Sequence, residues 1–199
     1  MLADLQDDWF LHVNTFARHT PALQTPVRLY AQFGVALFAG LLLLSWWWAR
    51  RDQDPGRMAA ALWAPIGALV ALAVNQPLGR LVAERRPYAV LPHVQVLVAR
   101  THDFSFPSDH AVMAGAVAAG VLLTHRRLGL LTLAAAVLLA FARVYVGAHF
   151  PLDVVAGLLV GAGVTVLGLV AVRPVATRLV VSLSKTPLRP LLVSPVAGS

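Results

Sequence analysis

The chain has 199 residues, of which 58% are hydrophobic and 13% charged, and its mean hydropathy is +0.72. Soluble domains contain about 45–50% apolar and about 25% charged residues, so this composition predicts a protein of the lipid bilayer. The formal net charge is +7, but the basic residues stand mainly at the ends of apolar runs, which argues against nucleic-acid binding, and the lack of cysteine excludes disulfides and thiolate chemistry.

Residues 1–26 lack the basic start and apolar stretch of a cleavable signal peptide. Their apolar residues recur at helical spacing on one face, which favours an amphipathic helix lying in the membrane interface. The alternative is a short helix outside the membrane that packs on the bundle. The residues of this face are Trp9, Phe10, Val13, Phe16 and Ala17.

Five apolar stretches follow, and a helix needs about 20 largely apolar residues to cross a bilayer. Four of the stretches are long enough, whereas the third is short and rich in alanine and glycine, so we expect neighbouring helices to shield it. The pattern predicts an all-α integral membrane protein, a bundle of about five transmembrane helices within residues 27–173 plus the N-terminal helix. The predicted spans are residues 27–49, 58–74, 108–124, 128–146 and 151–172.

The loops predict an orientation, because short basic loops stay in the cytoplasm. One side of the bundle carries Arg50, Arg51, Arg126 and Arg127, and the other carries the N-terminus and the long connection over residues 75–107. We expect the first side to be cytoplasmic. Residues 174–199 contain spaced basic residues and prolines, which is typical of a cytoplasmic, partly disordered basic tail near anionic headgroups.

Polar residues from separate segments gather at the outer face once this topology is drawn. Ionisable residues at membrane depth are costly and indicate function. The residues concerned are Arg80 and Arg86 after the second span, Ser108, Asp109 and His110 at the start of the third, Arg143 near the end of the fourth, and His149 and Asp153 around the start of the fifth.

Together these side chains cover the parts needed for phosphoryl transfer. His149 and Asp153 are four residues apart, so the carboxylate can orient the imidazole and leave its other nitrogen free to attack. The arginines suit the phosphoryl oxygens, and so do the helix-start N–H groups at Ser108 and Asp109. His110 is placed to protonate the departing oxygen. The set predicts a covalent phosphohistidine intermediate.

The other five histidines have no matching set of partners, and we interpret them as surface or interface residues. They are His12, His19, His93, His102 and His125.

The residues resemble the three signature motifs of the phosphatidic acid phosphatase type 2 superfamily. The motifs are Arg86-Pro87, then Pro107-Ser108-Asp109-His110, then Arg143 to His149 to Asp153. The resemblance implies that His149 is the nucleophile, Asp153 its partner and His110 the leaving-group acid. It also implies that Arg86, Arg143 and the Ser108 region bind the phosphate, and that no metal or other cofactor takes part.

Three positions depart from the family pattern. Gly79 stands where the first motif has a lysine, so the neighbouring Arg80 is the candidate for that anion contact. Asp109 replaces the glycine before the histidine of the second motif, and Ala142 replaces the serine before the arginine of the third. A carboxylate such as Asp109 should repel a phosphate unless it pairs with an arginine or points away.

The short chain and the Ser-Asp-His variant are similar to bacterial undecaprenyl-diphosphate phosphatases of the bacitracin-resistance type. This resemblance implies hydrolysis of undecaprenyl diphosphate to the monophosphate and phosphate, in support of carrier-lipid recycling for cell-wall synthesis. It implies a multi-pass protein of the bacterial plasma membrane with the active site on the extracytoplasmic face.

Several alternatives stay open at this level. The chain is also compatible with a broader lipid phosphatase acting on phosphatidate, phosphatidylglycerol phosphate or diacylglycerol diphosphate, and with a lipid phosphotransferase. Outside the enzymes, a membrane transporter or a lipid-binding protein is possible, although five spans without a visible repeat favour a transporter less.

Overall fold

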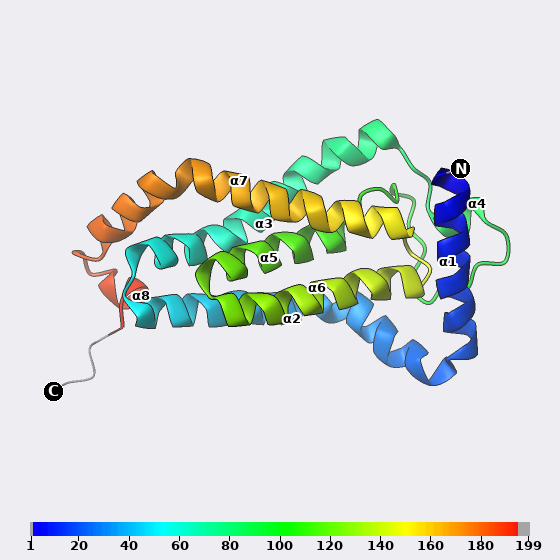
Figure 1. Cartoon of the computed structure of the whole chain (residues 1–199), viewed down its shortest axis with the longest axis horizontal. Helices are drawn as coiled ribbons and strands as arrows, with labels where there is room; N and C mark the ends of the chain where they lie inside the picture. Colours follow the sequence, from blue (N-terminus) through cyan, green and yellow to red (C-terminus); the bar gives the residue numbers. More distant parts are fainter. Residues whose placement is uncertain (1, 195–199) are drawn as a thin grey trace.

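A computed structural model describes residues 2–194 of the chain and confirms the predicted all-α class, because these residues contain helices and no strand. The helices form an elongated bundle with one helix lying across its end (Figure 1). Their bounds are α1 Leu2–His19, α2 Pro21–Asp52, α3 Pro55–Val82, α4 Pro87–Val90, α5 Asp109–Thr124, α6 Arg126–Tyr145, α7 Pro151–Leu183 and α8 Arg189–Leu192.

Helix α5 is the centre of the bundle and contacts α2, α3, α6 and α7. Seven of its 16 residues are alanine or glycine, and ten of its residues are buried. Because a side chain at Gly115 would overlap the backbone of Leu158, and one at Gly161 the backbone of Val112, α5 and α7 lie in direct backbone contact. The expectation that neighbouring helices shield this short segment is confirmed.

Four helical segments are long and apolar enough to cross a membrane: Pro21–Asp52, Pro55–Val90, Arg126–Tyr145 and Pro151–Leu183. Helix α5 is the shorter apolar one, as expected. The helices that surround α5 expose large apolar side chains on their outer faces, which suits contact with lipid. Examples are Leu43, Leu69, Leu131, Leu159 and Leu167.

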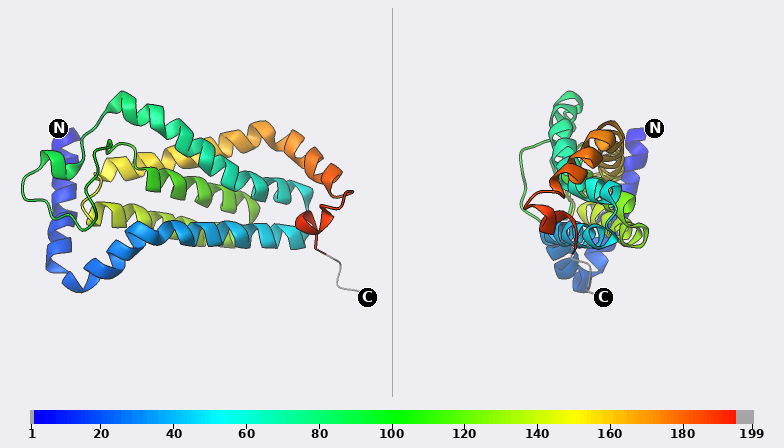
Figure 2. Two further views of the ribbon diagram at one scale, coloured as in Figure 1. Left: turned by 180° about the vertical axis from the view of Figure 1, so that it is seen from behind. Right: turned by 90° about the vertical axis from the view of Figure 1, so that its left-hand side faces the viewer.

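Helix α1 runs across the end of the bundle (Figures 1 and 2). Only part of its apolar face is covered by the bundle. Phe10 and Ala17 are fully buried, whereas Trp9 and Phe16 are about half exposed. The helix therefore packs on the protein and still presents apolar side chains outward. It ends at His19, and residues 21–26 belong to α2, which begins with Pro21 in its first turn and contains Pro26.

The C-terminal segment differs from the partly disordered tail that we expected. Helix α7 continues through Pro174 to Leu183, and α8 folds back over the end of the bundle. Leu192 is buried beside Met58 and Val180, and the Trp46 indole donates to the Leu191 carbonyl at 3.0 Å. Apolar side chains that continue beyond Pro174 explain the longer helix, and residues 195–199 of the expected tail lie outside the described part of the chain.

Candidate active site

His149 lies in the short turn between α6 and α7, at the end of the bundle near α1 and α4. The turn requires Gly147, which has a φ of +79° and whose missing side chain would overlap the Gln95 carbonyl oxygen. The Val146 carbonyl accepts from Leu97 N–H at 3.0 Å, which ties the turn to the long loop between α4 and α5. His149 is consequently held inside the protein and is only 2% exposed.

The hydrogen bonds of the His149 ring indicate its tautomer. Nδ1 lies 2.8 Å from the Ser105 carbonyl oxygen, which can only accept, so Nδ1 carries the proton. Nε2 lies 3.2 Å from Arg86 Nη1 and 3.5 Å from Arg143 Nη2, and arginine can only donate. The lone pair of Nε2 is therefore directed into a positively charged environment, where a phosphoryl group would be attracted.

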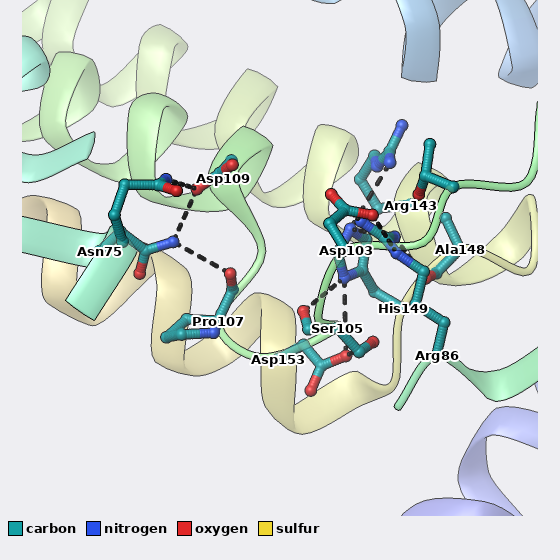
Figure 3. Close-up of polar contacts among 12 residues, drawn as sticks. Asn75, Arg86, Asp103, Ser105, Pro107, Asp109, Arg143, Ala148, His149 and Asp153 are labelled. Atoms are coloured by element: carbon teal, nitrogen blue, oxygen red, sulfur yellow. Dashed lines mark hydrogen bonds and ion pairs between the residues drawn. The ribbon is translucent and has the colours of Figure 1, made fainter. Parts of the chain in front are cut away.

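Asp153 contacts the His149 ring mainly through Ser105. It is fully buried in the first turn of α7, and its Oδ2 accepts from the Ser105 hydroxyl and from the Phe150 N–H. The same oxygen is 3.6 Å from His149 Nδ1, which is longer than a hydrogen bond. Asp153 is thus near His149, as its spacing predicts, but its hydrogen bond is to Ser105, whose carbonyl oxygen in turn accepts from the imidazole ring (Figure 3).

Ser105 is a site residue that the sequence analysis missed. It is fully buried in the loop before α5, and its N–H donates to the Glu84 carbonyl oxygen at 2.8 Å, which fixes the loop to the end of α3. The loop has no periodic pattern, and 44 residues separate Ser105 from His149. The only sequence signal for Ser105 is its position two residues before the motif Pro107-Ser108-Asp109-His110.

Arg86 and Arg143 flank His149, and each is only 8% exposed. Arg86 Nη1 donates to the Ala148 carbonyl oxygen at 2.9 Å, and Arg143 Nη1 donates to the Ala31 carbonyl oxygen at 3.3 Å. Arg143 Nε is buried and has no partner among the described residues. The two guanidinium groups are therefore held in place by backbone oxygens with donor capacity to spare, as a phosphate clamp requires.

Asp103 occupies part of this clamp and was also missed. Its carboxylate accepts from Arg86 Nε at 3.0 Å and from Arg86 Nη2 at 2.9 Å in a bidentate pair (Figure 3). Partial burial raises the pKa of Asp103, but the hydrogen bonds from Arg86 and Thr101 outweigh it and the pKa lies below its ordinary value. Asp103 is therefore an anion that occupies Arg86 in the substrate-free site.

His110 lies in the first turn of α5 and lines the same cavity as His149, Arg86 and Arg143, with a volume of about 280 Å³. Ser108, the residue before this helix, is fully buried, and its hydroxyl has no partner among the described residues. The structure thus brings together His149, His110, Arg86 and Arg143. Ser108, which the sequence places among the phosphate-binding residues, does not line this cavity.

Asp109 lines the edge of the cavity around His149 and also a neighbouring cavity, whereas Arg80 lines only the neighbouring one. Asp109 Oδ1 accepts from Asn75 Nδ2 at 2.7 Å and from Gln76 Nε2 at 3.3 Å, so its carboxylate is turned toward α3 (Figure 3). Two amide donors, rather than an arginine, hold it there. Arg80 lines a neighbouring cavity of about 240 Å³ together with Asp109 and does not line the cavity around His149.

None of the other five histidines lines the cavity around His149. His125 lies at the opposite end of the bundle, where it stacks on Trp48 with ring centroids 4.6 Å apart and accepts from the Leu128 N–H. It provides a control position for the functional experiments.

The chain matches the PAP2 superfamily over residues 60–175, which include all three motifs. The bacitracin transport permease protein BcrC of Bacillus licheniformis is 30% identical to it over 159 residues, which cover 80% of this chain and 76% of that protein. The undecaprenyl-diphosphatase BcrC of Bacillus subtilis (strain 168) is 28% identical over 151 residues, 76% of each chain. The crystal structure of Aquifex aeolicus LpxE is similar with a TM-score of 0.54 and 29% identity, over 81% of this chain and 93% of that one.

Proposed function

Because the chain belongs to the PAP2 superfamily and is a membrane phosphatase, we propose that its substrate is a polyprenyl diphosphate, undecaprenyl diphosphate in particular. The products are the lipid monophosphate and inorganic phosphate, a reaction that returns a carrier lipid for cell-wall synthesis. The similarity to an undecaprenyl-diphosphatase over three quarters of both chains supports this substrate. A site at the end of the bundle also suits a lipid, whose headgroup enters the cavity while its tail stays among the helices.

One observation carries the proposed mechanism: the unprotonated Nε2 of His149 lies between two guanidinium groups. Nε2 attacks the terminal phosphorus, and the bond from that phosphorus to the bridging oxygen breaks. His110 gives its proton to the bridging oxygen, so the lipid monophosphate leaves. Arg86 and Arg143 neutralise the charge on the phosphoryl oxygens during transfer.

The second half of the reaction regenerates the enzyme. The neutral His110 removes a proton from water, which attacks the phosphorus of the phosphohistidine, and inorganic phosphate leaves with His149 free again. Ser105 and Asp153 keep the ring orientation constant through both steps, because Nδ1 stays bonded to the Ser105 carbonyl. In this proposal arginines take the place of a metal ion as the electrostatic clamp.

We also propose that the active site faces the extracytoplasmic side. Arg50 and Arg51 at the end of α2, and Arg126 and Arg127 at the start of α6, lie at the end of the bundle opposite His149. Short basic loops of this kind stay in the cytoplasm, which supports a cytoplasmic C-terminal segment and an outward site.

A phosphate-release assay with EDTA present tests the proposed function. The purified protein is given undecaprenyl diphosphate, phosphatidate and phosphatidylglycerol phosphate in one detergent, and we expect the highest kcat/KM for the diphosphate. Preference for another lipid would indicate a broader phosphatase, and phosphate recovered on a second lipid would indicate a phosphotransferase.

Three variants test the assigned roles in the same assay. His149→Ala and His110→Ala are expected to lose at least about 100-fold in kcat, and His125→Ala is expected to keep the wild-type kcat. Equal losses in all three would contradict the assigned roles.

A further inference from the structure

Helix α2 contributes a side chain to the catalytic cavity that lies outside all three motifs. Gln32 lines the cavity together with His110, Arg143 and His149. The adjacent Ala31 carbonyl accepts from Arg143, so the backbone of α2 is fixed beside the clamp at this level. Gly34, whose missing side chain would press against Leu139 and Tyr30, allows α2 to approach α6 closely just beyond it.

The position of Gln32 along α2 places it near the membrane surface. It precedes Arg50, at the basic end of α2, by eighteen residues. At about 1.5 Å per residue this is roughly 27 Å along the helix, against a hydrocarbon core of about 30 Å, so Gln32 lies near the outer boundary of the membrane. Gln32 is exposed at this boundary and lines the cavity, so its amide can be reached by a headgroup that enters from the membrane surface.

The amide of Gln32 makes no hydrogen bond within the protein, unlike the polar groups of Tyr88 and Thr101 in the same cavity wall. The Tyr88 hydroxyl donates to the Thr101 carbonyl oxygen at 3.0 Å and accepts from the Thr101 N–H at 2.9 Å. Gln32 has no hydrogen-bond partner among the side chains and backbone groups that the structure describes. Its amide can therefore donate to a ligand without first breaking an internal bond.

Charge balance points to the kind of ligand. The formal charges of Arg86 and Arg143 are cancelled by those of Asp103 and Asp109 in the same cavity wall. A diphosphate carries more negative charge than a monophosphate, so the second phosphate requires a further positive group. Arg28 lies four residues before Gln32, on the same face of α2, is exposed, and has no ion-pair partner among the described residues.

The direction of the reaction indicates which phosphate these groups meet. In phosphoryl transfer the attacking atom, the phosphorus and the leaving oxygen lie roughly in line. The lipid-side phosphate therefore leaves on the side opposite His149, where His110 protonates its oxygen. We propose that Gln32, with Arg28 one turn before it on α2, forms the subsite for the lipid-side phosphate of a diphosphate substrate. This subsite rests on the proposed function and makes the enzyme selective for diphosphates.

The test uses the full-length protein in detergent, with farnesyl diphosphate as a soluble polyprenyl diphosphate and vanadate as an analogue of the transferred phosphoryl group. Gln32→Leu removes the amide and keeps the size of the side chain. We expect kcat/KM for farnesyl diphosphate to fall about tenfold, the effect of losing a hydrogen bond to a charged group. The Ki of vanadate should change less than about twofold, because the subsite around His149 is untouched.

The matched control is Phe33→Leu, since Phe33 is the next residue on α2, is 60% exposed and does not line the cavity. It should leave both kinetic quantities unchanged. Arg28→Gln should lower kcat/KM several-fold at low ionic strength, with a smaller loss in about 1 M salt, where the screening length is about 3 Å.

Two results would overturn the subsite. One is an unchanged kcat/KM in Gln32→Leu, and the other is a parallel loss of diphosphate turnover and vanadate binding, which would place Gln32 at the reacting phosphoryl group. Failure of the proposed function gives a different result, because the wild-type protein would then release no phosphate from farnesyl diphosphate at all.

Discussion

At the scale of single residues, the surroundings of His149 keep its imidazole neutral, the form that the proposed attack on phosphorus requires. Burial, followed by the charges of Arg143 and Arg86, lowers the pKa of His149 well below its ordinary value, and the bond to the Ser105 carbonyl offsets this only in part. The neutral ring is the nucleophilic form. With this lowered pKa, the proposed nucleophile needs no separate base to deprotonate it.

This pKa predicts the acid limb of the pH profile. Because the folded-state pKa is lowered, protonation of His149 begins only below the ordinary histidine value of about 6.5. As pH falls, kcat/KM should decline with a midpoint below pH 6.5, and it should show no acid loss between about pH 6.5 and 7.5. Initial rates with a diphosphate substrate across pH 4–8 measure this limb. A midpoint at or above pH 6.5 would show that the positive surroundings do not act on the nucleophile as described.

Asp103 leads to a second prediction at this scale. Its carboxylate holds two N–H groups of Arg86 that a phosphate would otherwise use, and its side chain is 59% exposed, so the pair is partly screened by water. Asp103→Asn should lower the Ki of vanadate about two- to fivefold, in keeping with an exposed ion pair of less than about 1 kcal/mol.

The control for Asp103→Asn is Asp52→Asn. Asp52 also pairs with an arginine, Arg57 at 2.6 Å, but at the opposite end of the bundle, and its removal should leave vanadate binding as it is. A weaker affinity for vanadate in Asp103→Asn would mean that Asp103 positions Arg86 for substrate rather than competing with it.

At the scale of helices, the precision of the site depends on how closely α5 and α7 approach. Helix α5 carries His110 in its first turn, and α7 begins two residues after His149. Gly161 lets the backbone of α7 reach that of α5 at Val112, where any side chain would overlap the carbonyl oxygen. Backbone contact therefore sets the separation of His110 and His149, the two histidines to which we assign catalytic roles.

Gly161→Ala should disturb this contact. The added methyl has to push the helices apart, so we expect the free energy of unfolding to fall by about 1–3 kcal/mol and kcat to fall with it. Gly163→Ala is the control, since a side chain at Gly163 meets nothing within 4 Å, and alanine is the better helix former. Thermal unfolding in one detergent compares the two. Similar losses in both variants would mean that the close approach is not what Gly161 provides.

The same elements show what sequence reasoning could and could not reach. Apolar runs with basic ends located the membrane helices, and the motif spacing placed His149, His110, Arg86 and Arg143 in one cavity. Helix ends were harder, because Pro174 lies inside α7 where apolar packing continues on both sides of it. Asp103 and Ser105 lie in a loop without periodicity, so only the folded chain shows that they touch Arg86 and His149.

At the scale of the whole molecule, all the residues of the site lie at one end of the bundle, and the basic ends of α2 and α6 lie at the other (Figure 1). Helix α1 crosses this end of the bundle with Trp9 and Phe16 exposed, and aromatic side chains such as tryptophan are enriched at membrane interfaces. This asymmetry supports a fixed orientation in the membrane.

Orientation can be measured directly because the chain contains no cysteine. A single cysteine is introduced in place of exposed His102, in the loop beside the site, or of exposed Lys185, beyond the end of α7. In intact cells a membrane-impermeant maleimide should label His102→Cys and leave Lys185→Cys unlabelled until the membrane is permeabilised, provided that both variants keep phosphatase activity. The reverse pattern would place the catalytic end in the cytoplasm, and the arginines at the other end of the bundle could then no longer be explained as cytoplasmic anchors.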